Sequence, residues 1–366
     1  MLFKNRRLPL SRFTLLHSQF TLPPMDPISQ GVLGSIAALT FAKPTHTRLA
    51  ALAGCIGGML ADADILISSE SDPLLSIEYH RHFSHSLAFI PIGGLIAAAL
   101  LYPFLRNSLS KANLYLYCTA GYATAGLLDA CTSYGTQLLW PFSDLRISWS
   151  IISIIDPVFT LPLLILLGLA VFKRSPRFAR IASIFALSYL SFGILQNHRA
   201  SSHLQELVAS RGHHTATRLT VKPSIANLIL WRSIYLHEGT FYVDALRVGF
   251  FSSNRTYPGQ SIPAFDTKAK IAELTHDNPL AKDLARFNHF SEGYLAQLPS
   301  EPNFIIDLRY SAIPNSINPL WGIDLSDTTE SGHAAFETRR KIPEADRKAF
   351  VHMLKGEQSL PQIPEG

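Results

Sequence analysis

The chain has 366 residues and a formal net charge of +5, and only 16% of its residues are charged. Soluble globular domains carry about 25% charged residues, so the composition excludes an ordinary soluble protein as a description of the whole chain. The excess of basic residues is typical of the loops of a membrane protein. No basic stripe interleaved with aromatic residues indicates a nucleic-acid partner.

Composition divides the chain into three regions. Residues 1–24 contain four basic residues but no apolar core of the length usual in a signal peptide, so we expect a leader or a true translation start at Met25. Residues 25–196 are rich in Leu, Ile, Ala, Phe and Gly and predict an α-helical polytopic membrane domain. Residues 197–366 contain frequent charges and prolines and predict a mixed α+β domain that faces water.

Six apolar segments of the second region are candidates for helices that cross or enter a bilayer. They are Ile28–Ala42, Leu49–Ile67, Ser86–Leu105, Ala112–Leu128, Ile147–Phe172 and Ile181–Gln196. Basic residues gather in the connections after the first, third and fifth segments, and the positive-inside rule places these connections in the cytoplasm. The chain after Gln196 is then expected on the external side.

Acidic and histidine side chains fall at the external ends of these segments. Asp62 and Asp64 close the second segment, and Asp129 follows the fourth. The others are Asp26, Ser29, Gln30, His80, His82, His85, Thr132 and Asp156. Charged groups at membrane depth are costly and mark function, and carboxylates with imidazoles suit Zn²⁺, Mn²⁺ or Fe²⁺. We therefore predict one metal site, provided that the helix ends or unwinds at Asp62, because residues two apart diverge on a continuous helix.

Structural roles compete with this interpretation at every position. Asp62 and Asp64 are also suited to cap a helix or to pair with Arg81. His80 and His85 could be interfacial histidines, and Asp129 could accept backbone hydrogen bonds in a turn. Asp156 precedes Pro157, which is a common turn pair.

The ordered motifs resemble a family of membrane-bound, metal-dependent hydrolases of the bacterial inner membrane that is also described as LexA-binding. The motifs are Met25–Gly34, Asp62–Asp64, His80–Ser86, Leu128–Gln137, Trp140–Ser143, Ile155–Phe159, Asn227–Arg232 and Asp307–Arg309. The resemblance implies a hydrolase of phospholipid-like phosphodiesters or other amphiphilic esters, with a divalent metal that is zinc or manganese. It places the metal ligands at Asp62, Asp64, His80, His85 and Asp129. Ala125 departs from the pattern, because many relatives carry a histidine there.

Catalysis would then involve three residues. Asp62 would act at the metal, Arg81 would bind an anionic substrate or pair with an acid such as Glu78, and Asp156 would be a further or supporting ligand. A non-enzymatic receptor or assembly protein that works through its C-terminal domain is the alternative, with a protein partner that the sequence does not name. A small-solute transporter ranks last, because the acids lie at helix ends and no internal repeat is present.

The third region shows short alternating runs. Phe241–Phe251 and Asn303–Tyr310 predict strands, with Ile225–Tyr235 as a further candidate. Ala264–Leu298 and Ala334–Lys355 predict helices.

Overall fold

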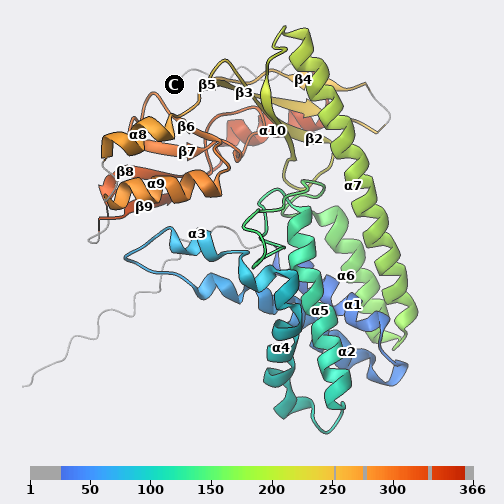
Figure 1. The fold of residues 1–366 in the computed structure, drawn as a ribbon. Coiled ribbons are helices and arrows are strands. Elements are labelled where there is room, and N and C mark those ends of the chain that lie inside the picture. The colour runs from blue at the N-terminus through green and yellow to red at the C-terminus, as the bar shows by residue number, and fades with distance from the viewer. Residues whose placement is uncertain (1–25, 251–252, 275–277, 329–331, 359–366) are drawn as a thin grey trace, which may run out of the picture.

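A helical bundle is followed by a region of antiparallel sheets and helices in the computed structural model, which confirms the predicted fold class (Figure 1). The structure describes residues 26–250, 253–274, 278–328 and 332–358. The expected leader or start within residues 1–25 lies outside these ranges.

The helical half is built from six longer helices and several short turns. The longer helices are α1 (Pro27–Thr40), α2 (Thr47–Leu60), α4 (Ile90–Leu105), α5 (Lys111–Cys131), α6 (Pro157–Phe172) and α7 (Pro176–Ser210). The short elements are η1 (Pro44–His46), η2 (Ala61–Leu66), α3 (Leu75–Tyr79), η3 (Phe83–His85) and η4 (Leu87–Phe89). Proline begins α1, α6 and α7. The first N–H groups of a helix have no hydrogen-bond partner within the helix, so the missing N–H of proline costs nothing there.

Three helical stretches among the described residues are long and apolar enough to cross a membrane, namely Pro44–Leu66, Leu87–Leu105 and Pro176–Ser210. α6 is apolar but shorter. The predicted segment Ile147–Phe172 is wrong in its first ten residues, because the helix begins only at Pro157, with Asp156 as its cap. The number of spans stays a prediction.

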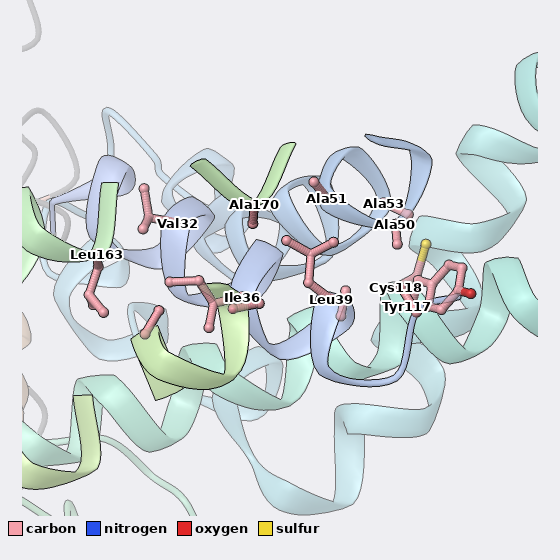
Figure 2. Packing of buried hydrophobic residues seen from close by; sticks show 14 of the residues in the cluster. Val32, Ile36, Leu39, Ala50, Ala51, Ala53, Tyr117, Cys118, Leu163 and Ala170 are labelled. Atoms are coloured by element: carbon pink, nitrogen blue, oxygen red, sulfur yellow. The ribbon is translucent and has the colours of Figure 1, made fainter. Parts of the chain in front are cut away.

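Small residues let three helices pack closely in the bundle core. A Cβ atom on Gly54 of α2 would lie 2.4 Å from the carbonyl oxygen of Gly34 in α1, and one on Gly121 of α5 would lie 2.2 Å from that of Gly54. Close backbone approach at small residues is the usual packing of membrane helices, because lipid supplies no hydrophobic force between them. Figure 2 shows the neighbouring buried side chains of α1, α2, α5 and α6.

The C-terminal half contains two antiparallel sheets. The first has the order β1 (Thr217–Pro223), β2 (Leu230–His237), β3 (Thr240–Arg247), β4 (Arg255–Tyr257), with β5 (Ser261–Pro263) also on β3. The second has the order β6 (Leu295–Gln297), β7 (Phe304–Asp307), β8 (Trp321–Thr328), β9 (Ala334–Thr338). The helices are α8 (Thr267–Leu274), α9 (Pro279–Phe290) and α10 (Glu344–Lys355).

Each predicted strand overlaps an observed strand, but both predicted helices need correction. Ala264–Leu298 contains α8 and α9 and then ends in strand β6. Ala334–Lys355 begins with strand β9, and only its second part forms α10. β9 pairs with β8, which places Ala334 and Phe336 in the core. This long-range pairing overrides the helical tendency of the isolated segment.

α7 joins the two halves as one continuous helix. It runs through Gln196, where composition set the boundary, and continues to Ser210. Ala200 and Leu204 pack against Trp231 of β2, and the Gln196 amide donates to the carbonyl oxygens of Leu228 and Val248. In Figure 1, α7 extends from the end of the bundle remote from the sheets to the sheets themselves.

An ion-pair network also fastens the two halves. Arg286 of α9 lies 3.0 Å from Asp72 and 2.6 Å from Glu78, both in the helical half, and 3.1 Å from buried Asp283. Asp72, Asp283 and His333 have the spacing of a metal site, but Arg286 already supplies their cation.

Replacing Arg286 by methionine should loosen this contact. We expect the free energy of unfolding to fall by about 2 kcal/mol, the size of a charged hydrogen bond at a partly exposed site. Chemical denaturation of the detergent-solubilised protein measures it, with exposed Lys282→Met on the same helix as the control. An unchanged midpoint for Arg286→Met would show that this ion-pair network adds nothing measurable to the contact between the halves.

Candidate metal centre

Asp62 and Asp64 lie where the second apolar segment changes its winding. The α-helix ends at Leu60, and both carboxylates belong to the 3-10 turn η2. A single site that includes both carboxylates requires such a break, and the structure contains it. The tighter turn lets both carboxylates reach one imidazole, that of His85.

Asp64 organises the segment between α3 and α4. Its carboxylate oxygens lie 3.0 Å from His80 Nδ1, 2.9 Å from the Arg81 backbone nitrogen and 2.9 Å from Ser84 Oγ. Arg81 has a φ of 59°, a left-handed conformation that is uncommon outside glycine. Its N–H therefore turns toward Asp64, while its carbonyl oxygen accepts from the Gln137 N–H.

His85 lies at the centre of the cluster. Its Nε2 is 3.1 Å from an oxygen of Asp62 and 3.0 Å from an oxygen of Asp129, and its Nδ1 is 3.1 Å from Asp64. Burial alone would lower the pKa of His85, but the three carboxylates outweigh burial and raise it well above its usual value. The three carboxylates around this imidazole therefore favour its protonated form.

Two further side chains complete the cluster. The Gln30 amide donates to Asp62 at 3.3 Å and to Asp129 at 3.2 Å. The Arg81 guanidinium lies 3.2 Å from Asp129, donates to Thr132 and faces the Tyr134 ring. Arg81 thus pairs with Asp129 inside the cluster, whereas Glu78 pairs with Arg286.

The composition of the cluster fits a divalent cation. Asp62, His85 and Asp129 are buried, and each offers one ligand atom within 4.8 Å of the others. Three carboxylates face one guanidinium, so negative charge stays uncompensated unless a proton or a metal is bound. Among the described residues, five buried atoms of the cluster also have no hydrogen-bond partner. Two of them, Arg81 Nε and Asp129 Oδ2, lie 3.2 Å apart as an ion pair, and the others are Asp62 Oδ2, His80 Nε2 and Gln30 Oε1.

The structure brings all five predicted ligands together, whereas Asp156 lies outside the cluster. One oxygen of Asp156 accepts from the N–H groups of Val158 and Phe159 at the start of α6, and the other accepts from the Tyr189 hydroxyl at 2.8 Å. Its contacts are those of a helix cap, which was the structural alternative.

Sequence reasoning missed several residues that support the cluster. Arg146 is buried and donates to the carbonyl oxygens of His80 and Gly135. The Tyr122 hydroxyl donates to the carbonyl oxygen of Ser84. The hydropathy pattern places Tyr122 in an apolar segment and Arg146 in a connection between segments. No local sequence motif marks either residue. Ala125 packs against Ala61 and Tyr122, one helical turn before Asp129.

A cavity of about 460 Å³ lies between α3 and α9, and none of the residues that line it belongs to the cluster. Arg146 and His82 line it, and these two residues tie it to the segment that carries His80. Glu78, Asp144 and Arg286 add charge to its wall, and Leu74, Ile77 and Phe290 are apolar. Burial, followed by the charge of Arg146, lowers the pKa of His82, so this imidazole is held neutral.

Comparison with known proteins identifies a family for the helical half and a relative whose match extends beyond it. Residues 25–200 match the family model described as YdjM inner membrane protein. Uncharacterized protein YfhP of Bacillus subtilis is 22% identical over 289 residues, which cover 77% of this chain and 84% of that protein. Inner membrane protein YbcI of Escherichia coli is 32% identical over 106 residues, which cover 28% of this chain and 60% of YbcI. No solved structure matches.

Proposed function

We propose that this chain, whose residues 25–200 belong to the YdjM inner membrane protein family, is a metal-dependent hydrolase of amphiphilic esters. The observation that carries the proposal is the buried group of Asp62, His85 and Asp129, with their ligand atoms within 4.8 Å of one another. Such a concentration of acid at membrane depth is costly without a bound cation.

The residues of the cluster divide into those that would hold the metal and those that position them. Asp62, His85 and Asp129 would hold it, and Asp64 and His80 lie close enough to contribute. A bound divalent ion would supply Lewis-acid polarisation of an ester and would make a water molecule more acidic. Asp64 orients His80, Ser84 and His85, and Arg81 keeps Asp129 ionised and fixed.

The neighbouring cavity suits the polar end of an amphiphile. Its wall combines the Arg146 guanidinium, whose Nε has no hydrogen-bond partner among the described residues, with the apolar side chains of Leu74 and Ile77. Arg286 also lines the wall, but it is already paired with Glu78. Arginine matches the geometry of a phosphate or carboxylate group. An ester bound here would lie at the mouth of the helical bundle, beside the segment that carries the candidate ligands.

Charge supports an external location for this site. The basic connections after α1, α4 and α6 are expected in the cytoplasm. The turn between α4 and α5 lies at the end of the bundle remote from the C-terminal sheets (Figure 1). The cluster and the C-terminal domain would accordingly face the external side of a bacterial inner membrane.

Metal analysis with two matched carboxylate variants tests the proposal. Asp129→Asn is expected to reduce the metal of detergent-purified protein from about one ion per chain to background, because it removes a charged ligand. Asp156→Asn changes an equally buried carboxylate whose contacts are those of a cap, and it should keep the wild-type metal content. Elemental mass spectrometry gives the content, and mass spectrometry of lipid products gives hydrolysis.

The outcomes separate hydrolysis from a purely structural metal. Equal, negligible metal in wild type and Asp129→Asn would overturn the metal site itself. Metal without release of product from a panel of glycerophospholipids and other amphiphilic esters would favour the non-enzymatic alternative. One observation supports that alternative, because all five candidate ligands are buried, and closed sites are typical of structural metals.

A further inference from the structure

Two buried cations of the C-terminal domain have no acidic partner among the described residues. Lys222 of β1 is 6% exposed, and its ammonium donates to a single protein acceptor, the carbonyl oxygen of Ser133 at 2.9 Å. Arg232 of β2 is 4% exposed, and its guanidinium donates only to backbone carbonyl oxygens, including those of Leu308 and Pro314. Its Nε has no hydrogen-bond partner in the part of the chain that the structure describes. Arg309 nearby differs, because it pairs with Asp307 and Glu292.

Both cations line one cavity of about 200 Å³. The ion-paired Arg309 also lines this cavity, and the rest of its wall is largely apolar and includes Ile155, Ile225, Leu320 and Ile342. Ile155 and Ile225 are 44% and 53% exposed, so they form an apolar mouth rather than part of the core. A cavity with buried positive charge inside and an apolar mouth is complementary to an anionic amphiphile, whose head group is charged and whose chain is apolar.

The cavity lies where the C-terminal domain meets the helical bundle. Ser133 follows the end of α5, and Ile155 immediately precedes the cap of α6. The Ala226 N–H donates to Ser153 Oγ and to the carbonyl oxygen of Ile155, which fixes the β1–β2 connection against the start of α6. The mouth therefore adjoins the end of an apolar helix, where lipid is available.

We propose that this cavity binds the anionic head group of an amphiphile, with the phosphate or carboxylate against Lys222 and Arg232 and the acyl chain leaving past Ile155 and Ile225. A buried charge that forms no ion pair is unfavourable, and an anionic ligand would supply an ion-pair partner. The site shares no residue with the metal cluster. The lipid-binding proposal can therefore be tested independently of the proposed hydrolase activity.

Lipid retention by the full chain tests the site. Wild-type protein is equilibrated in nanodiscs that contain phosphatidylglycerol or phosphatidylcholine, transferred to a neutral detergent and examined by native mass spectrometry. We expect retained phosphatidylglycerol on wild type and at least about tenfold less on Lys222→Met, which keeps side-chain length and removes the charge. Lys282→Met, an exposed lysine of α9, is the matched control and should retain wild-type amounts.

A second variant separates ligand binding from folding. Ile225→Trp changes an exposed residue of the mouth, so it should fold normally and still lower retention of phosphatidylglycerol. Inorganic phosphate and oleate are added in parallel as competitors, because they distinguish a free anion from an anionic amphiphile. Competition by oleate supports the proposal. Equal phosphatidylglycerol retention in wild type, folded Lys222→Met and Ile225→Trp overturns it, as does competition by inorganic phosphate alone.

Discussion

Replacing Arg81 by methionine is expected to make the stability of the protein depend on bound metal. Arg81 is 1% exposed, and its guanidinium is the one non-titrating cation within 4 Å of the Asp62, Asp64 and Asp129 carboxylates in the described structure. Removing one partner of a buried ion pair leaves the other uncompensated, which costs about 3–5 kcal/mol. A divalent ion among the same carboxylates would replace much of the lost positive charge.

Thermal and chemical unfolding with and without a chelator measure this effect. The metal-stripped variant should lose about 3–5 kcal/mol relative to metal-stripped wild type, and added Zn²⁺ or Mn²⁺ should restore much of that loss. Arg106→Met, in the exposed turn after α4, is the control and should behave as wild type in both states. An equal loss with and without metal would assign Arg81 to packing against Tyr134 instead of to charge compensation.

The sequence located the cluster because two independent signals coincide there. Acidic and imidazole groups are unusual beside apolar segments, and alternation of the segments across a bilayer brings their external ends together. Neither signal needs tertiary detail. This is why Asp62, His85 and Asp129 could be grouped although they are far apart along the chain, and why the structure brings them into contact.

The supporting residues could not be predicted in this way. Arg146 lies in an irregular segment, and its role depends on which carbonyl oxygens the fold places beside it. The contact of Gln30 with Asp129 could not be predicted either, because the distance between them is fixed only by the packing of α1 on α5. Asp156 shows the opposite case. Its position before a proline correctly indicated a local structural role, whereas the membrane topology wrongly grouped it with the metal ligands.

Replacing Gly126 by alanine should disrupt the metal centre without touching a ligand. Gly126 lies on α5, one turn before Ala130, and faces the backbone of His85. A Cβ atom there would lie 2.0 Å from the carbonyl oxygen of His85, far inside van der Waals contact. Because the obstacle is backbone, η3 must move as a unit, and His85 moves with it. We expect metal affinity to fall about 10–100-fold, as for changes that misplace a ligand, and stability to fall by about 1–3 kcal/mol.

Gly168 of α6 supplies the matched control, because a Cβ atom there would meet nothing within 4 Å. Alanine at this exposed helical position should leave metal affinity unchanged and raise helix stability by up to about 1 kcal/mol. Metal titration of both purified variants, followed by competition with a chelator, gives the affinities. Wild-type affinity in a folded Gly126→Ala protein would mean that the segment carrying His85 shifts without penalty. The precise placement of that imidazole would then not be what the cluster requires.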